Sequence, residues 1–122
     1  MKYEISVERT FSAAHALREY KGKCENLHGH NWRVRVTVSG LKLDKMGMVV
    51  DFTDLKSALD AVLSKLDHTN LNDINPFNTV NPSAENIAAY IYEGLKKYQL
   101  PQIKIASVEV WESESSSAKY SE

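Results

Sequence analysis

The sequence predicts an α+β fold: an antiparallel β-sheet with two helices packed on one face. Residues 3–11 and 30–39 alternate apolar and polar side chains, the period of a half-buried strand. Two later segments place apolar residues at helical spacing, and a final segment returns to alternation. Strands grouped apart from helices favour this class over alternating α/β folds. At 122 residues, the chain 1–122 is expected to form one domain.

The first strand is predicted over residues 3–11, where alternation is broken only at Arg9. Residues 12–29 show no clear period and are expected to form a long loop. Loops of that length in compact domains are usually functional. The second strand is predicted over about 30–39, with Arg33 on its solvated face.

The first helix is predicted over 54–66, because its apolar residues form one amphipathic stripe. Either Asp51 or Thr53 is expected to cap its N-terminus. A polar loop rich in Asn and Asp follows over 67–81.

The second helix is predicted to open at Pro82 and Ser83 and to run to about Tyr98. Residues 103–112 are predicted to form the last strand, and a further short strand is expected at 48–50 or in the polar tail from Ser113. The side chains expected to face inward from the second helix are Ala84, Ile87, Ala88, Ile91, Leu95 and Tyr98.

Charge and composition exclude several classes of function. With 15 basic and 16 acidic residues the chain lacks the electrostatic footprint of a nucleic-acid or anionic-membrane binder. Its single cysteine cannot form an internal disulfide, which favours a reducing compartment. The N-terminus lacks the apolar core of a signal peptide, and no segment has the roughly 20 apolar residues of a membrane span. A cytoplasmic protein is expected.

The segment from Cys24 to His30 carries the strongest chemical signal. His28 and His30 lie two residues apart and run into the second strand, so both side chains project from one face and continue its apolar row. Converging imidazoles are a natural beginning for a zinc site. The alternative is a pair of ordinary polar loop residues.

The third ligand of such a site would be His15 or His68, unless a carboxylate serves. His15 follows the first strand, and pairing of the first two strands would bring it beside His28 and His30. Three histidines without a thiolate are typical of catalytic zinc, which keeps one coordination position open.

Cys24, the Asp67-His68 pair and Glu112 are further candidates for chemistry. Cys24 lies in a polar loop and could be a proton-transfer thiol, a fourth ligand or a small buried side chain. Asp67 precedes His68 and could orient its imidazole, although sequence neighbours in a loop often point apart.

Glu112 shares the parity of Val108 and Val110, which should face the core. A carboxylate there is costly unless it meets a donor, such as the N–H groups of a heterocycle. Alternatively, Glu112 is a solvated strand end.

These residues resemble the 6-pyruvoyltetrahydropterin synthase / 6-carboxytetrahydropterin synthase family nearly from end to end. The most specific match is the cysteine placed three residues before His28-Gly29-His30. The other matching motifs are Phe11-Ser12-Ala13-Ala14-His15, Val50-Asp51-Phe52, Leu66-Asp67-His68 with Leu71-Asn72, Pro82-Ser83-Ala84-Glu85-Asn86 and Val110-Trp111-Glu112.

The resemblance implies zinc on His15, His28 and His30. It also implies a proton-transfer triad of Cys24, Asp67 and His68, and a pterin ring anchored by Glu112. The implied fold is the tunnelling fold, assembled as two stacked trimers with active sites between subunits.

The implied activity is that of a zinc-dependent lyase acting on 7,8-dihydroneopterin triphosphate. The short gap between Cys24 and His28 resembles the branch that releases acetaldehyde and triphosphate and forms 6-carboxy-5,6,7,8-tetrahydropterin for queuosine synthesis. The alternatives are the pyruvoyl-forming synthase, a folate-branch enzyme that uses a glutamate such as Glu25 and forms a hydroxymethyl product, and a non-catalytic pterin- or metal-binding protein.

Overall fold

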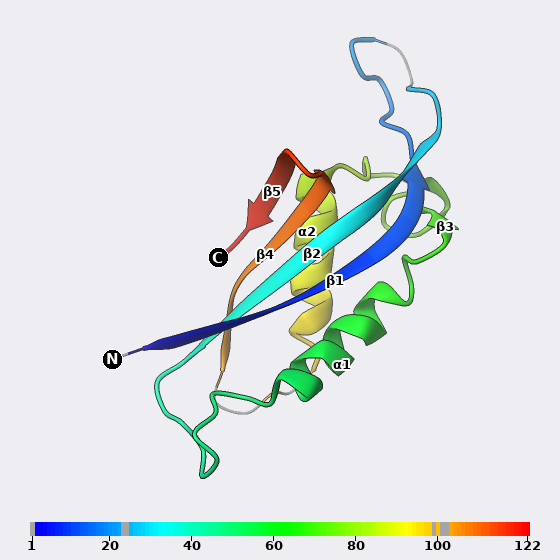
Figure 1. The fold of residues 1–122 in the computed structure, drawn as a ribbon. Helices are drawn as coiled ribbons and strands as arrows, with labels where there is room; N and C mark the ends of the chain where they lie inside the picture. Colours follow the sequence, from blue (N-terminus) through cyan, green and yellow to red (C-terminus); the bar gives the residue numbers. More distant parts are fainter. Residues whose placement is uncertain (1, 23–24, 99, 101–102) are drawn as a thin grey trace.

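The computed structural model describes residues 2–22, 25–98, 100 and 103–122. Its five strands form one sheet in the order β3-β1-β2-β4-β5, with the two helices against one face (Figure 1). Apart from a parallel pairing of β1 with β3, neighbouring strands are antiparallel, so the predicted α+β class is confirmed. The elements are β1 (Tyr3–His15), β2 (His28–Gly40), α1 (Phe52–Leu63), β3 (Thr69–Asn70), the 3₁₀ helix η1 (Leu71–Asp73), α2 (Ala84–Leu95), β4 (Lys104–Ser113) and β5 (Ser116–Tyr120).

β1 and β2 pair along their full lengths, from Tyr3 opposite Gly40 to His15 opposite His28. The prediction that the loop begins at residue 12 is therefore wrong. Alternation in fact continues past Phe11, since Ala13 and His15 are buried on the same face as Phe11. The small side chain of Ala13 carries little apolar signal, although its backbone keeps the ladder intact.

Both helices begin where the sequence predicts a cap. The carboxylate of Asp51 accepts a hydrogen bond from the Thr53 backbone N–H at 2.8 Å, so Asp51 is the cap of α1. The Ser83 hydroxyl accepts from the Asn86 N–H at the start of α2. The inward placement of Tyr98 is wrong: α2 ends at Leu95, and beyond that point Tyr98 leaves the buried stripe and is 41% exposed.

The remaining differences lie in polar segments. Of the two places considered for an extra strand, residues 48–50 form none, and β5 forms in the Ser-rich tail against β4. β3 arises inside the predicted 67–81 loop, where Thr69 and Asn70 pair with Ala13 and Ala14. This short pairing holds the chain after α1 against the end of β1.

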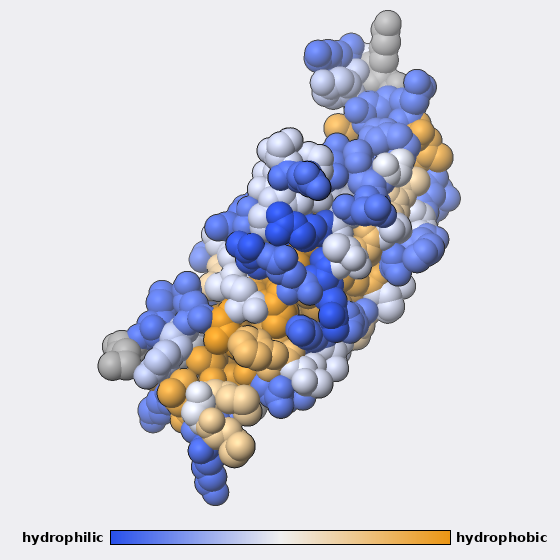
Figure 2. Space-filling view, viewed as in Figure 1, coloured by the Kyte–Doolittle hydropathy of each residue, from blue (hydrophilic) through white to orange (hydrophobic). Residues whose placement is uncertain are grey.

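The helix-free face of the sheet is polar at its centre. Arg33 stacks over Trp111, with 3.8 Å between the guanidinium carbon and the ring centroid, and Glu8 pairs with Arg35. Figure 2 shows hydrophilic side chains over the middle of this face and a hydrophobic area toward the N-terminus of the chain.

On the helix side of the sheet, Arg9 interrupts the apolar row of β1. Its charge is not left unpaired, because Arg9 pairs with Asp60 of α1 at 2.9 Å. Among the described residues, no helix is long and apolar enough to cross a membrane.

Candidate metal centre

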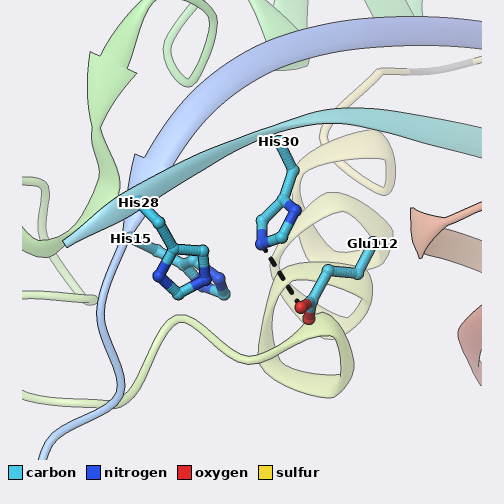
Figure 3. A group of neighbouring side chains, drawn as sticks. All are labelled: His15, His28, His30 and Glu112. Atoms are coloured by element: carbon cyan, nitrogen blue, oxygen red, sulfur yellow. Dashed lines mark ion pairs between the residues drawn. The ribbon is translucent and has the colours of Figure 1, made fainter. Parts of the chain in front are cut away.

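Three imidazoles meet where β1 ends and β2 begins. His15 lies directly opposite His28, and His30 lies opposite Ala13, two residues further along β2. The ring centroids of His15, His28 and His30 are 4.7–5.0 Å apart, and Figure 3 shows the rings projecting from the same face. The predicted convergence of these histidines is therefore present in the structure. It brings His15 to the pair, and His68 is not part of the cluster.

The hydrogen bonds of His15 and His28 leave on each ring the free nitrogen that a metal ligand requires. The Nδ1 atom of His15 lies 2.7 Å from the Pro82 carbonyl oxygen, and that of His28 lies 2.8 Å from the Asn26 carbonyl oxygen. A carbonyl only accepts, so each Nδ1 donates a proton and each Nε2 keeps its lone pair. The buried Nε2 atoms of His15 and His30 have no hydrogen-bond partner among the described residues. An orphaned buried nitrogen is costly unless something binds it, so these residues fit a metal ion.

Glu112 reaches the same point from β4. One ligand atom from each of His15, His28, His30 and Glu112 can be chosen so that all lie within 4.8 Å of one another, and this group could hold a metal ion. The Glu112 Oε1 atom is 3.3 Å from His30 Nε2, an ion-pair distance without the alignment of a hydrogen bond (Figure 3). The parity predicted for Glu112, on the face of Val108 and Val110, agrees with this position.

The environment of His30 favours the neutral ring that a metal requires. Burial lowers the pKa of His30, opposed by the nearby Glu112 carboxylate. Beneath the cluster, the fully buried Trp32 packs edge-on against His15 and His30 and donates its indole N–H to the Ala13 carbonyl. The Trp32 ring therefore supports two of the three imidazoles from the core side.

Asp67 and His68 form a second polar group, on the chain held by β3. Asp67 Oδ1 accepts from the Ser12 backbone N–H at 2.9 Å and lies 3.0 Å from His68 Nδ1. The predicted pairing of the two side chains is thus present. The backbone of His68 has a φ of 59°, and its imidazole is 82% exposed. With Nδ1 toward Asp67, the ring presents its other nitrogen to solvent beside a shallow hollow that also touches Ser12 and His30.

The Ser12 N–H, followed by the contact with His68, lowers the pKa of Asp67 below its ordinary value of 3.8. A carboxyl with a depressed folded-state pKa stabilises the fold above its unfolded pKa, and the effect is lost as pH falls through the folded value. We expect Asp67→Asn to flatten the decline in unfolding free energy between about pH 5 and pH 2. Urea unfolding across this range, with exposed Asp73→Asn as control, measures it. Equal acid sensitivity of wild type and Asp67→Asn would contradict the coupling.

Cys24, the predicted proton-transfer thiol, lies outside the described residues. Its neighbour Glu25 is engaged with the backbone of the same loop: its Oε1 atom accepts from the Leu17 N–H at 3.0 Å, and its own N–H donates to the Leu17 carbonyl at 2.9 Å. The carboxylate of Glu25 therefore closes the loop that leads into the histidines.

Sequence reasoning missed the groups that bind His15 and the residues after it. The Pro82 carbonyl bonds His15, and the side-chain amides of Asn72 and Asn81 bond Ala16 and Arg18. These groups lie in segments treated as a helix start and a polar loop. The one available signal was the density of Asn in residues 67–81, which indicates side-chain bonding to backbone without naming its target.

Comparisons with known proteins agree with this fold. The family model described as 6-pyruvoyl tetrahydropterin synthase matches residues 4–122. A Synechocystis protein named 6-carboxy-5,6,7,8-tetrahydropterin synthase is 42% identical, over 95% of this chain and 91% of the relative. A Pyrococcus furiosus protein named dihydroneopterin monophosphate aldolase is 39% identical, over 92% and 91%. The solved Caenorhabditis elegans 6-pyruvoyl tetrahydropterin synthase is 32% identical with a TM-score of 0.88, covering 100% of this chain and 96% of that one.

The family match defines the class of protein: a pterin-processing enzyme, here built on a mostly antiparallel sheet with three histidines gathered at one end. The chain belongs to the 6-pyruvoyl tetrahydropterin synthase family. Within that family its relatives carry names for different reactions, so the family alone does not select the reaction.

Proposed function

We propose that this protein is a zinc-dependent lyase that converts 7,8-dihydroneopterin triphosphate and one water to 6-carboxy-5,6,7,8-tetrahydropterin, acetaldehyde and triphosphate, in queuosine synthesis. The observation that carries the proposal is the convergence of three imidazoles with Glu112 on a family-typical sheet. The name of the 42% identical Synechocystis relative and the Cys24-to-His28 spacing support the carboxy branch.

In this proposal His15, His28 and His30 hold zinc through their Nε2 atoms. Zinc, when bound, supplies a Lewis acid that acidifies side-chain hydroxyls of the substrate. The chain's own groups move the protons. Cys24 acts as the thiolate, and His68, oriented through Nδ1 by Asp67, exchanges protons from its exposed nitrogen.

Glu112 is proposed to anchor the pterin through its 2-amino and N3 groups. It is half-buried at the end of an apolar row, and its carboxylate can accept two N–H donors, a match that favours the protonated edge of a pterin over a simple solvated end. Its contact with His30 leaves a second role open to test, that of a fourth metal ligand.

We expect Glu112→Ala to weaken pterin binding roughly 10–100-fold, because a hydrogen bond to a charged group contributes about 1.5–3 kcal/mol. Zinc content should stay at the wild-type level. Calorimetric titration with a non-reacting pterin, beside metal analysis of the same sample, measures both. Full pterin affinity would remove Glu112 from the substrate site, and loss of zinc would make it a ligand. Glu109→Ala, on the opposite face of β4, is the matched control.

The function itself is tested by mass spectrometry of the products formed from 7,8-dihydroneopterin triphosphate. The proposal expects the 6-carboxy product together with acetaldehyde. A 6-pyruvoyl product would mean that the chain has the activity for which the C. elegans protein is named. A 6-hydroxymethyl product would indicate the folate branch and a chemical role for Glu25. Binding without turnover would leave a non-catalytic pterin- or metal-binding protein.

The site is open in a single copy of the chain. His28 and His68 are exposed, although a proton-transfer site needs a wall against water. We propose that further copies provide that wall in a homohexamer of two trimers, with active sites between subunits. A cytoplasmic location is proposed with this assembly, as the sequence predicts.

A further inference from the structure

We propose that Asn81, together with Asn72, is a positioning residue for the metal centre: the two side-chain amides lock the chain after His15 to the segment whose Pro82 carbonyl fixes the His15 ring. This inference rests on the proposed zinc site. It assigns a role in metal binding to residues whose side chains do not reach the metal position.

The two amides bind the backbone after β1 as a neighbouring strand would. Asn72 accepts from the Ala16 N–H at 2.9 Å and donates to the Ala16 carbonyl at 2.8 Å. Asn81 repeats this pairing two residues later, accepting from the Arg18 N–H at 2.8 Å and donating to the Arg18 carbonyl at 3.1 Å. Alternate residues of an extended chain present both backbone groups to the same side. Two separate Asn side chains therefore continue the ladder that β1 leaves at His15.

The Arg18 side chain adds hydrogen bonds in the reverse sense, from residues 16–18 to backbone carbonyls of the segment that carries the two Asn residues. Its guanidinium donates to the Phe77 carbonyl at 2.7 Å, with longer contacts at 3.4 Å to the carbonyls of Asn72 and Val80. The segment from η1 to Pro82 is thus bound to residues 16–18 by both backbone and side-chain groups.

Pro82 is held on both sides. Before it, the Asn81 side chain is bound to Arg18, and the Asn81 carbonyl accepts from the Asn86 amide at 2.8 Å. After it, Ser83 is the cap of α2. The proline ring restricts φ as well. The direction of the Pro82 carbonyl is therefore set by the Asn network and the helix start.

That carbonyl is the hydrogen-bond partner of His15 Nδ1, at 2.7 Å. His15 is 1% exposed, so in the folded structure the Pro82 carbonyl and not bulk water satisfies its Nδ1–H group. Fixing Nδ1–H leaves Nε2 as the lone-pair donor, on a ring whose centroid lies 4.7 Å from that of His28 and 5.0 Å from that of His30. Through this chain of contacts Asn81 influences the metal without touching it.

The test compares zinc affinity of full-length wild type and Asn81→Ala by competition with a chromophoric chelator. We expect about tenfold weaker binding, the lower end of the 10–100-fold loss seen when outer-shell partners are removed. Asn78→Ala, exposed in the same segment, is the matched control and should bind zinc like wild type.

A second readout separates positioning from general loosening of the fold. In the zinc-loaded protein, NMR should show the His15 Nδ1–H proton exchanging with solvent at least about tenfold faster in Asn81→Ala, while the buried Trp32 indole proton, bonded to Ala13, exchanges as in wild type. Equal acceleration of both protons would mean a merely structural role and would overturn the inference.

The outcomes also distinguish this inference from the proposed function. Wild type that binds no zinc would overturn both. Wild type that binds zinc, with Asn81→Ala binding equally well, would overturn the positioning role alone. If Asn81→Ala does not fold, Asn81→Asp is the second variant, which keeps an acceptor for the Arg18 N–H and loses the donor to the Arg18 carbonyl. The zinc affinity of Asn81→Asp should still fall. A wild-type zinc affinity in Asn81→Asp would reject the positioning role.

Discussion

Replacement of His28 by alanine is expected to release zinc and abolish turnover. His28 is the right ligand to remove, because it is exposed and its loss leaves no cavity in the core, unlike the fully buried His15. Removing a direct ligand should cost more than the roughly 10–100-fold in affinity lost with an outer-shell partner. We therefore expect the purified variant to be folded by circular dichroism and to carry far less than one zinc per chain by elemental analysis.

The fourth histidine is the matched control. His68 lies outside the cluster and its ring is exposed, so His68→Ala should keep zinc at the wild-type level while losing proton transfer. Both variants replace a histidine by alanine, so comparing them separates the loss of zinc binding from the loss of proton transfer. Zinc retained by His28→Ala would show that the ligand set is wrong, and zinc lost from His68→Ala would place His68 among the ligands.

The geometry of the histidine cluster followed from strand periodicity. His28 and His30 share a parity, and antiparallel pairing of two consecutive strands brings the end of the first to the start of the second. Period two and one hairpin-like connection therefore predicted His15 beside the pair. They left His68 open as an alternative, which only the folded structure removes from the cluster. The parity of Glu112 followed in the same way from Val108 and Val110.

Features held by polar contacts were not predictable from periodicity. β3, β5 and the last four residues of β1 consist mostly of small or polar residues, and their backbones pair without a continuous row of large apolar side chains. The Asn72 and Asn81 pairings depend on which backbone groups the fold brings near, and this is known only once the chain is folded. Asn in a polar loop indicates such bonding but does not identify its partner.

Cys24→Ala is expected to lose turnover by about 10²–10⁴-fold, the usual contribution of a positioned acid or base. The zinc ligands and Glu112 come from β1, β2 and β4, so zinc content and pterin affinity should remain close to wild type. Steady-state kinetics with dihydroneopterin triphosphate, beside metal analysis and pterin titration, measures all three. Unchanged turnover would remove the thiol from the mechanism, and a non-catalytic binder would show none even with Cys24 present.

The neighbouring Glu25 makes this substitution informative about the product as well. Glu25 Oε1 accepts from the Leu17 N–H, a bond that a glutamine oxygen can also accept, so Glu25→Gln should keep the loop closed while removing the charge. If Cys24 is the proton-transfer group, Glu25→Gln keeps the carboxy product and most of its rate, whereas Cys24→Ala loses both. If the carboxylate is instead the base, the order reverses, and Cys24→Ala still forms a hydroxymethyl product. Two adjacent side chains, each changed with little alteration in size, therefore distinguish the carboxy branch from the folate branch by rate and by product mass.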